Sequence, residues 1–369
     1  MSAKHTFDLA VIGGGPAGTS AAITAARTGA NVLLAERGKL PRQRVCGEFV
    51  SAESLELLSD LLKDSRLLSH ALRIPEARLF FDGHVVSAPV EPQAASIARL
   101  DLDLALWNAA RNAGVMTRLQ TSIEKITGSE PFSLFTSEDI HEARAVIDAS
   151  GRWSNLRNHS ASNSAINGAK WLGVKAHFSE PEPHPSVDLY FFDGGYCGVQ
   201  PVTLSGSSPG EGRVNACAMI CSDAARTLQD VIPLHPALRA RAEKWKALGD
   251  PVSTSPLFFR EPEPVQDRIL LAGDSAGFVD PFVGDGISLA LRSGALTAQA
   301  LLPFLQGKST LEQSAARYAQ QYRDRLLPVF RNSSRLRRLL NLPRPLRRSV
   351  GHLLESSPAF SRLLVQWTR

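Results

Sequence analysis

Short apolar runs alternate with glycine turns and a helical pattern in the first part of the chain. Residues 7–12 read Phe-Asp-Leu-Ala-Val-Ile, a run typical of a buried parallel strand. An alanine-rich stretch that ends near Gly29 predicts a helix, and a second apolar run at residues 31–35 predicts another strand. Strand, turn, helix and strand in this order indicate a Rossmann-like βαβ unit.

The turn of this unit has the Gly-X-Gly-X-X-Gly spacing, with Gly13, Gly15 and Gly18. Gly13 permits a tight turn, Gly15 lets the backbone approach a pyrophosphate, and Gly18 allows the helix to pack closely on the strand. Glu36 follows the second strand, where an acidic side chain can hold a ribose diol. The pattern predicts a dinucleotide site but leaves NAD and FAD open.

A second glycine-rich segment lies far along the chain. Residues 268–272 predict a strand that ends at Gly273 and Asp274, and a loop at residues 281–287 precedes a helix predicted to begin near Gly286. Here the chain resembles a flavoprotein family of geranylgeranyl reductases, flavin halogenases and aromatic hydroxylases of the p-hydroxybenzoate hydroxylase type. The resemblance implies that FAD is the cofactor and that Asp274 binds its ribityl chain.

The same resemblance, which extends over most of residues 1–300, implies further contacts to FAD. The loop at residues 281–287 would present N–H groups to the flavin, Arg99 would reach FAD from a helix start, and Ile123 would border the adenine. The alternative for Arg99 is an exposed residue at a helix start. The residues predicted to bind FAD are Gly13, Gly15, Ala17, Gly18, Glu36, Arg37, Arg44, Gly47, Arg99, Ile123, Gly273, Asp274, Pro281, Gly284, Gly286 and Ile287.

Residues 44–49 read Arg-Val-Cys-Gly-Glu-Phe. In geranylgeranyl reductases a Cys-Gly pair follows a basic residue at a similar place near the flavin. The resemblance makes Cys46 the candidate catalytic residue, because a thiol can donate a proton or tune the flavin. The alternative is a small residue that packs against the flavin ring.

Two β-hairpins are predicted at residues 78–86 and 187–202, and a further strand at residues 214–220. A sheet over the flavin would wall a pocket for an apolar or aromatic substrate. Its aromatic residues could instead fill the core of the sheet. The predicted lining residues are Tyr190, Phe191, Phe192 and Tyr196.

The predicted fold class is α/β, with a Rossmann-like FAD-binding domain, an interleaved β-sheet substrate domain and a helical C-terminal region. A 43% share of hydrophobic residues is enough for a substantial core. The predicted ranges are 1–70, 99–158 and 265–305 for the FAD-binding domain, 71–98 and 159–264 for the β-rich substrate domain, and 306–369 for the C-terminal region.

Charge is distributed unevenly along the chain. From Arg317 onward there are twelve arginines and no lysine against two acidic residues, although the whole chain carries only +5. Three prolines, at positions 343, 345 and 358, divide this tail into short amphipathic helices. Such helices fit either an anionic membrane surface or packing over the core. No nucleic-acid motif accompanies the charge, so we expect no nucleic-acid partner.

Cysteine usage and hydropathy indicate the compartment. The four cysteines fit a reducing cytoplasm, and Cys217 and Cys221 are expected in the core. No Cys/His spacing indicates a metal site, and no apolar run of about 18 residues predicts a membrane span. The first strand begins too early for a signal peptide. We expect a cytoplasmic protein, with peripheral membrane contact through the C-terminal helices as an option; the oligomeric state stays open.

The predicted function is that of an FAD-dependent oxidoreductase acting on a hydrophobic polyketide-, prenyl- or lipid-like substrate. Reduction or desaturation by hydride transfer through flavin N5 is favoured, with NADPH or a partner reductase as the electron donor. Direct use of NADPH as in the hydroxylases is in doubt, because Ser150 stands where their Asp-Gly motif has aspartate. The alternatives are a monooxygenase that hydroxylates or epoxidises, and a non-catalytic electron-transfer flavoprotein.

Overall fold

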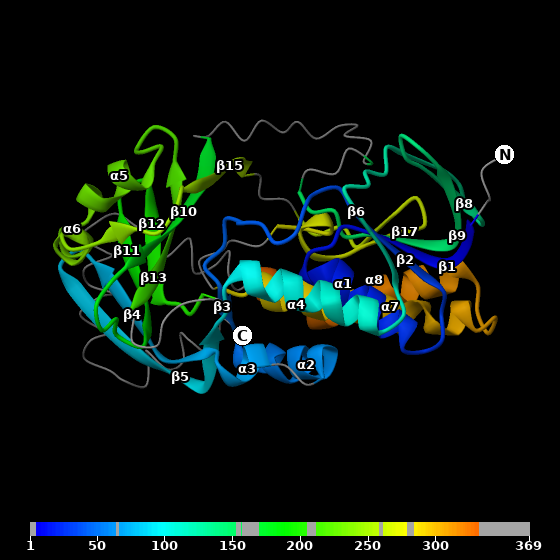
Figure 1. Ribbon diagram of the computed structural model, residues 1–369, viewed down its shortest axis with the longest axis horizontal. Helices are drawn as coiled ribbons and strands as arrows, with labels where there is room; N and C mark the ends of the chain where they lie inside the picture. Colours follow the sequence, from blue (N-terminus) through cyan, green and yellow to red (C-terminus); the bar gives the residue numbers. More distant parts are fainter. Residues whose placement is uncertain are drawn as a thin grey trace.

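The computed structural model describes residues 5–63, 66–152, 156, 170–204, 212–257, 261–278 and 284–331. Its elements form two β-sheets that lie toward opposite ends of the long axis, with helices between them (Figure 1). This is a mixed α/β architecture, which confirms the predicted fold class. The predicted domain boundaries stay a prediction.

The first sheet contains eight strands among the described residues, and its core is parallel, in the order β17-β9-β1-β2-β6. Apolar residues fill its central strands because helices or other strands cover both faces. The strands are β1 (His5–Ile12), β2 (Val32–Glu36), β6 (Met116–Leu119), β7 (Lys125–Gly128), β8 (Phe132–Phe135), β9 (Ile140–Asp148), β16 (Val265–Gln266) and β17 (Ile269–Leu271).

Helix α1 (Pro16–Ala26) follows β1 and is buried along almost its whole length. It packs against α7 (Gly286–Leu305), and a Cβ at Gly294 of α7 would overlap the carbonyl oxygen of Ala17. A Cβ at Gly18 would likewise overlap the carbonyl oxygen of Gly13. Glycine is therefore required at Gly18 and Gly294 for the helices to approach this closely.

The second sheet contains nine strands among the described residues, and the predicted hairpins are confirmed. Asp82 and Gly83 form the turn of one hairpin, both with positive φ, which brings Phe81 opposite His84. The strands are β3 (Phe49–Val50), β4 (Leu72–Phe81), β5 (His84–Ser96), β10 (Trp171–Ser179), β11 (Ser186–Phe192), β12 (Gly195–Pro201), β13 (Arg213–Cys221), β14 (Lys246–Ala247) and β15 (Val252–Leu257).

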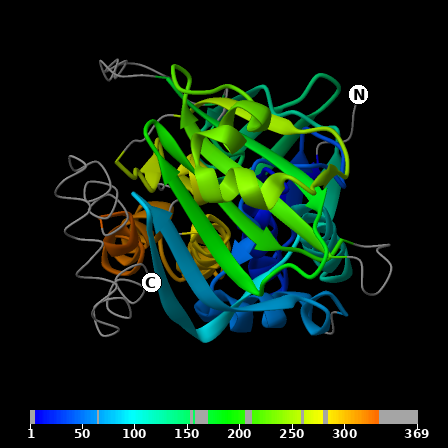
Figure 2. The same cartoon turned by 90° about the vertical axis from the view of Figure 1, so that its left-hand side faces the viewer.

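One face of the second sheet is covered by the short helices α5 (Leu228–Val231) and α6 (Pro236–Ala242), which lie in front of the sheet in Figure 2. Tyr190 and Phe192 belong to the apolar cluster on this covered face, and Tyr190 stacks on Phe80 with ring centroids 4.5 Å apart. Their predicted place in a substrate pocket is therefore wrong. Side chains alternate between the two faces of a strand, and these positions point away from the first sheet.

The remaining helices are α2 (Ala52–Leu62), α3 (Arg66–Ser69), α4 (Arg99–Asn112) and α8 (Leu311–Arg325), with 3-10 turns at Ile232–Leu234 and Gly273–Ser275. Helix α8 is tied to the first sheet because the Tyr318 hydroxyl donates to the carbonyl of Leu271 at 2.6 Å. None of the described helices is both long and apolar enough to cross a membrane. The C-terminal helices predicted beyond residue 331 lie outside the described residues.

Candidate functional site

A cavity of about 640 Å³ lies where the two sheets and the starts of α1, α4 and α7 meet. Its volume is within the range of about 300–1,000 Å³ that is usual for ligand and cofactor sites. Most of the residues predicted to bind FAD or to act in catalysis line it. They are Gly15, Ala17, Glu36, Arg37, Arg44, Cys46, Gly47, Arg99, Gly273, Asp274, Gly284, Gly286 and Ile287.

Four predicted residues have other positions. Gly13 and Gly18 pack against each other behind the cavity wall and shape the turn. Ile123 is buried and is not part of the lining. Pro281 lies outside the described residues. For all of these residues, contact with FAD stays a prediction.

The start of α1 offers free backbone donors to the cavity. Gly15 is the N-cap residue, no described side chain caps the helix, and a Cβ at Gly15 would meet no atom of the described residues within 4 Å. The first N–H groups of a helix have no partner within the helix, and they bind phosphate well. The open space at Gly15 therefore fits a pyrophosphate group.

Glu36 stabilises the glycine turn between β1 and α1 through hydrogen bonds of its carboxylate. One carboxylate oxygen accepts from the Gly14 N–H at 2.8 Å, and the other accepts from the Gly38 N–H and from Arg42 Nη2, each at 2.8 Å. The side chain is 4% exposed and faces the cavity. A carboxylate has about four lone-pair sites, so Glu36 can still accept a hydrogen bond from a ribose hydroxyl.

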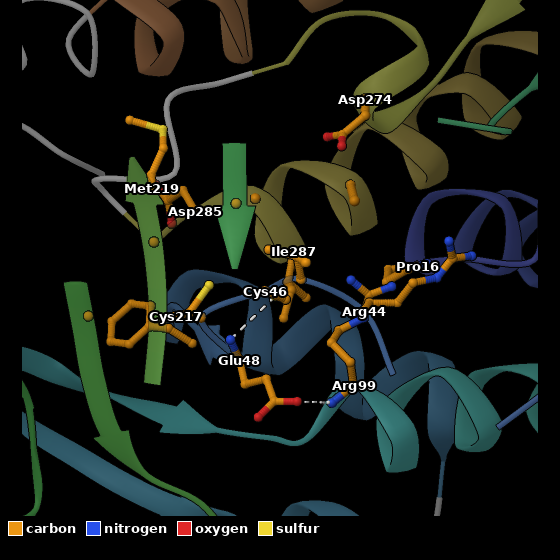
Figure 3. A pocket seen from close by; sticks show the side chains of 18 of the residues that line it. Pro16, Arg44, Cys46, Glu48, Arg99, Cys217, Met219, Asp274, Asp285 and Ile287 are labelled. Atoms are coloured by element: carbon orange, nitrogen blue, oxygen red, sulfur yellow. Dashed lines mark hydrogen bonds between the residues drawn. The ribbon is translucent and has the colours of Figure 1, made fainter. Parts of the chain in front are cut away.

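Asp274 lies at the far end of the cavity, as Figure 3 shows. Its carboxylate is 3.5 Å from Arg152 Nε, and the Arg152 guanidinium lies 4.2 Å from the ring centroid of Phe278. Asp274 lines the cavity, and its side chain is 39% exposed. Desolvation raises its pKa, although Arg152 and Arg99 lower it.

Two arginines in the cavity wall have a buried nitrogen that finds no hydrogen-bond partner within the described part of the chain. These atoms are Nε of Arg44 and Nη1 of Arg152. Buried donors of this kind are rare, and a bound anion or acceptor satisfies them. Together with the open space at Gly15 and the N-terminus of α7, where Gly286 and Ile287 line the cavity, they fit FAD.

The second sheet supplies the apolar half of the cavity. Alternate residues of its strands face inward, because side chains two positions apart share a face. The cations among the described lining residues are Arg37, Arg44, Arg99 and Arg152, and none of them belongs to this sheet. The lining residues from this sheet are Phe49 of β3, Ala77 and Leu79 of β4, Val86, Ala88 and Val90 of β5, Gly173 of β10, Val187 and Leu189 of β11, Tyr196, Gly198 and Gln200 of β12, Cys217, Ala218 and Met219 of β13, and Val252, Ser253, Thr254 and Leu257 of β15.

Of the four aromatic residues predicted to line the pocket, Tyr196 does so. Phe191 packs against Tyr196 with ring centroids 5.9 Å apart but is not part of the lining. Cys217 lines the cavity instead of lying in the core as expected, whereas Cys221 is buried. Burial raises the pKa of the Cys217 thiol well above its usual value.

Cys46 lies between the two halves of the cavity, beside Glu48 and Arg99 (Figure 3). The backbone N–H of Glu48 donates to Cys46 Sγ at 3.3 Å. Burial disfavours the charged guanidinium of Arg99, but Asp103 at 2.8 Å and the Cys46 thiol raise the pKa of Arg99 above its usual value. Arg99 therefore stays charged next to Cys46.

Sequence reasoning missed a buried polar cluster behind Cys46. Glu48 is fully buried and accepts hydrogen bonds from Lys175 Nζ at 2.5 Å and from His177 Nε2 at 2.8 Å. Lys175 and His177 stand two positions apart in β10, between apolar residues. That alternation was a usable signal, because a buried lysine requires a partner.

The comparisons with known proteins agree with this geometry. Residues 8–47 match the family model of FAD-dependent oxidoreductases. The digeranylgeranylglycerophospholipid reductase 2 of Methanopyrus kandleri is 28% identical over 346 residues, which cover 86% of this chain and 82% of that protein.

Solved structures share the fold. A geranylgeranyl bacteriochlorophyll reductase-like protein of Thermoplasma acidophilum superposes with a TM-score of 0.77 at 19% identity, covering 99% of this chain and 96% of the other. A flavin-dependent brominase superposes with a TM-score of 0.73 at 19% identity, covering 98% of each chain.

These findings define the class of the protein. The chain is an FAD-dependent oxidoreductase with the fold of the geranylgeranyl reductases and flavin halogenases. The predicted cofactor and the prediction of an enzyme are confirmed, and the alternative of a non-catalytic flavoprotein is wrong.

Proposed function

We propose that this enzyme reduces carbon–carbon double bonds of a prenyl-type, apolar substrate. The observation that carries the proposal is the apolar half of the cavity, which opens directly onto Cys46 and the start of α7. The reductase of Methanopyrus kandleri, a relative by sequence, is named for a digeranylgeranyl substrate and supports a prenyl chain as the group that enters.

The charge distribution in the cavity supports the same substrate class. The second sheet contributes mostly aliphatic, small and aromatic side chains. Its polar lining residues include Ser253 and Thr254 of β15, which carry no charge, and Gln200, which donates to Ser96 Oγ at 2.7 Å. An anionic head group would find no counter-charge among the described residues of this sheet that line the cavity. The part of the substrate that lies against the second sheet is therefore apolar and uncharged.

The residues around Cys46 provide what the reduction needs from the protein. Bound, reduced FAD supplies the two electrons as a hydride equivalent. The remaining requirement is a proton for the second carbon of the double bond. Cys46 Sγ lines the cavity and is the proton donor in this proposal, with the Arg99 guanidinium beside it to stabilise the thiolate that forms.

Product analysis tests the proposal against oxygenation. FAD-loaded protein reduced with one equivalent of dithionite is mixed under argon with digeranylgeranyl glycerophospholipid, and the products are weighed by mass spectrometry. The expected product has gained two hydrogens per reduced double bond. A product that has gained oxygen, formed only in air, would instead make the enzyme a monooxygenase.

The role of Cys46 has its own test. Cys46→Ala should keep the visible FAD spectrum and lower kcat by about 10²–10⁴-fold, the usual contribution of a general acid. Cys221→Ala is the matched control, because Cys221 is buried and is not part of the described lining. Equal kcat values for the two variants would remove Cys46 from the mechanism.

A further inference from the structure

A single buried carboxylate connects the turn that carries Cys46 to two other elements of the fold. Glu48 accepts from the backbone N–H of Arg99 at 2.8 Å, the first residue of α4. The same oxygen accepts from Lys175 Nζ, and the other oxygen is 2.8 Å from His177 Nε2. Glu48 thereby joins its own turn to α4 and to β10 of the second sheet.

The donors around this carboxylate are themselves held in place. Lys175 is 1% exposed, and its ammonium also donates to Gln43 Oε1 at 3.2 Å. Gln43 belongs to the same turn as Cys46 and approaches His177 Nδ1 with its amide nitrogen. Despite its burial, Glu48 has a lowered pKa because His177 and Lys175 stabilise its charged form.

The backbone of Glu48 acts directly on Cys46. Its N–H donates to Cys46 Sγ at 3.3 Å, and Glu48 adopts a φ of 62°, a left-handed conformation that glycine would adopt without strain. Asn215 of β13 donates to the Cys46 carbonyl at 3.0 Å. The Glu48 N–H therefore contacts the sulfur while Asn215 holds the backbone of Cys46, and the chain keeps a carboxylate at a position that sterically favours glycine.

We propose that Glu48 is a positioning residue, whose carboxylate fixes the Cys46 thiol and the Arg99 guanidinium in one arrangement at the flavin side of the cavity. Lys175 and His177 hold that carboxylate from the second sheet. This inference rests on the proposed function for the importance of Cys46. The geometry itself is testable in the resting enzyme without turnover.

The test is the alkylation of Cys46 by iodoacetamide in oxidised, FAD-loaded protein, followed by peptide mass spectrometry from pH 6 to 10. The pH at which the alkylation rate is half-maximal reports how strongly neighbouring donors stabilise the Cys46 thiolate. The constant rate reached at high pH reports how easily iodoacetamide reaches the sulfur. The charged or titratable groups that face Cys46 are Arg99 from α4, Cys217 from β13, and Glu48 with its partners Lys175 and His177 from β10.

Two double variants form a matched pair, because Lys175→Met removes the lysine that would otherwise be buried without the counter-charge of Glu48. Glu48→Ala/Lys175→Met has no acceptor for the Arg99 N–H, whereas Glu48→Gln/Lys175→Met keeps one. We expect the alkylation midpoint to rise by about one pH unit in the alanine variant, as when a thiolate loses a cationic or N–H donor, and by less than half of that in the glutamine variant.

Equal midpoints in the wild type and both variants would overturn the proposal, as would equal shifts in the two variants. Should the alanine variant not fold, Glu48→Asp carries the same expectation, because the shorter side chain cannot reach the Arg99 N–H and Lys175 together. Asp188→Asn controls for general destabilisation, since Asp188 is an equally buried, ion-paired carboxylate on the covered face of the second sheet. A wild type that fails to reduce prenyl substrates would leave this alkylation test intact.

Discussion

Replacing Gly15 by alanine separates binding of the cofactor from stability of the fold. Gly15 has φ −78° and ψ −177°, which any residue adopts, and its added Cβ would contact no atom within 4 Å in the part of the chain that the structure describes. The apo protein should therefore fold with unchanged stability or gain about 0.4–1 kcal/mol through a less flexible unfolded chain.

The same methyl group would point into the space where the pyrophosphate is expected. Displacing one hydrogen bond between a backbone N–H and a charged phosphate costs about 1.5–3 kcal/mol. That range corresponds to a Kd for FAD about 10–150-fold higher. Gly18→Ala is the matched control, because its Cβ would overlap the Gly13 carbonyl and should destabilise the apo protein by about 1–3 kcal/mol.

Fluorescence titration of apo protein with FAD gives Kd, and urea unfolding of the same apo protein gives the free energy of unfolding. Gly15→Ala should raise the Kd for FAD without lowering the free energy of unfolding of the apo protein. Gly18→Ala should lower that free energy of unfolding. A Gly15→Ala protein that binds FAD as tightly as the wild type would refute the pyrophosphate assignment. A loss of apo stability as large as that of Gly18→Ala would refute the packing argument.

Three further changes test other parts of the site. Asp274→Ala should weaken FAD binding by about 5–150-fold, measured by the same titration, because a ribityl hydrogen bond is lost; an unchanged Kd would contradict this role. Leu189→Trp should raise KM for a prenyl substrate with unchanged FAD affinity, since Leu189 lies in the apolar half of the cavity. An unchanged KM would mean that the substrate does not bind in this half. Folding lowers the pKa of Glu48 below its ordinary 4.5, so its carboxylate stabilises the fold above about pH 4.5, and this contribution disappears as the pH falls further. Urea midpoints from pH 6 to 3 should therefore fall less steeply in Glu48→Gln/Lys175→Met, and parallel curves would contradict the assignment.

Local patterns made the nucleotide-binding unit and the hairpins predictable. The strand at residues 7–12, the glycine turn and the helix that follows are each encoded by neighbouring residues, and so is the Asp82-Gly83 turn. Local patterns could not predict which face of the second sheet lines the cavity. Alternation groups Tyr190 with Phe192, but only the packing of α5 and α6 shows that their face is turned away from the cavity.

The cluster around Glu48 shows a second limit of sequence reasoning. Lys175 and His177 in an apolar strand indicate a buried polar partner, but many acidic residues of the chain could supply it. The partner is set by how β10 packs against the turn at residues 43–48, which is a long-range contact. The chemistry of Cys46 could be anticipated from its glycine neighbour, whereas the residues that orient it could not.

The most direct test of the proposed reduction is an anaerobic titration followed at the visible absorbance band of oxidised flavin. Photoreduced enzyme is mixed under argon with increasing amounts of a prenyl substrate. Reduction of the substrate predicts that the oxidised flavin spectrum returns in proportion to the double bonds consumed. A spectrum that stays bleached until oxygen is admitted, with oxygenated product appearing only then, would contradict the account.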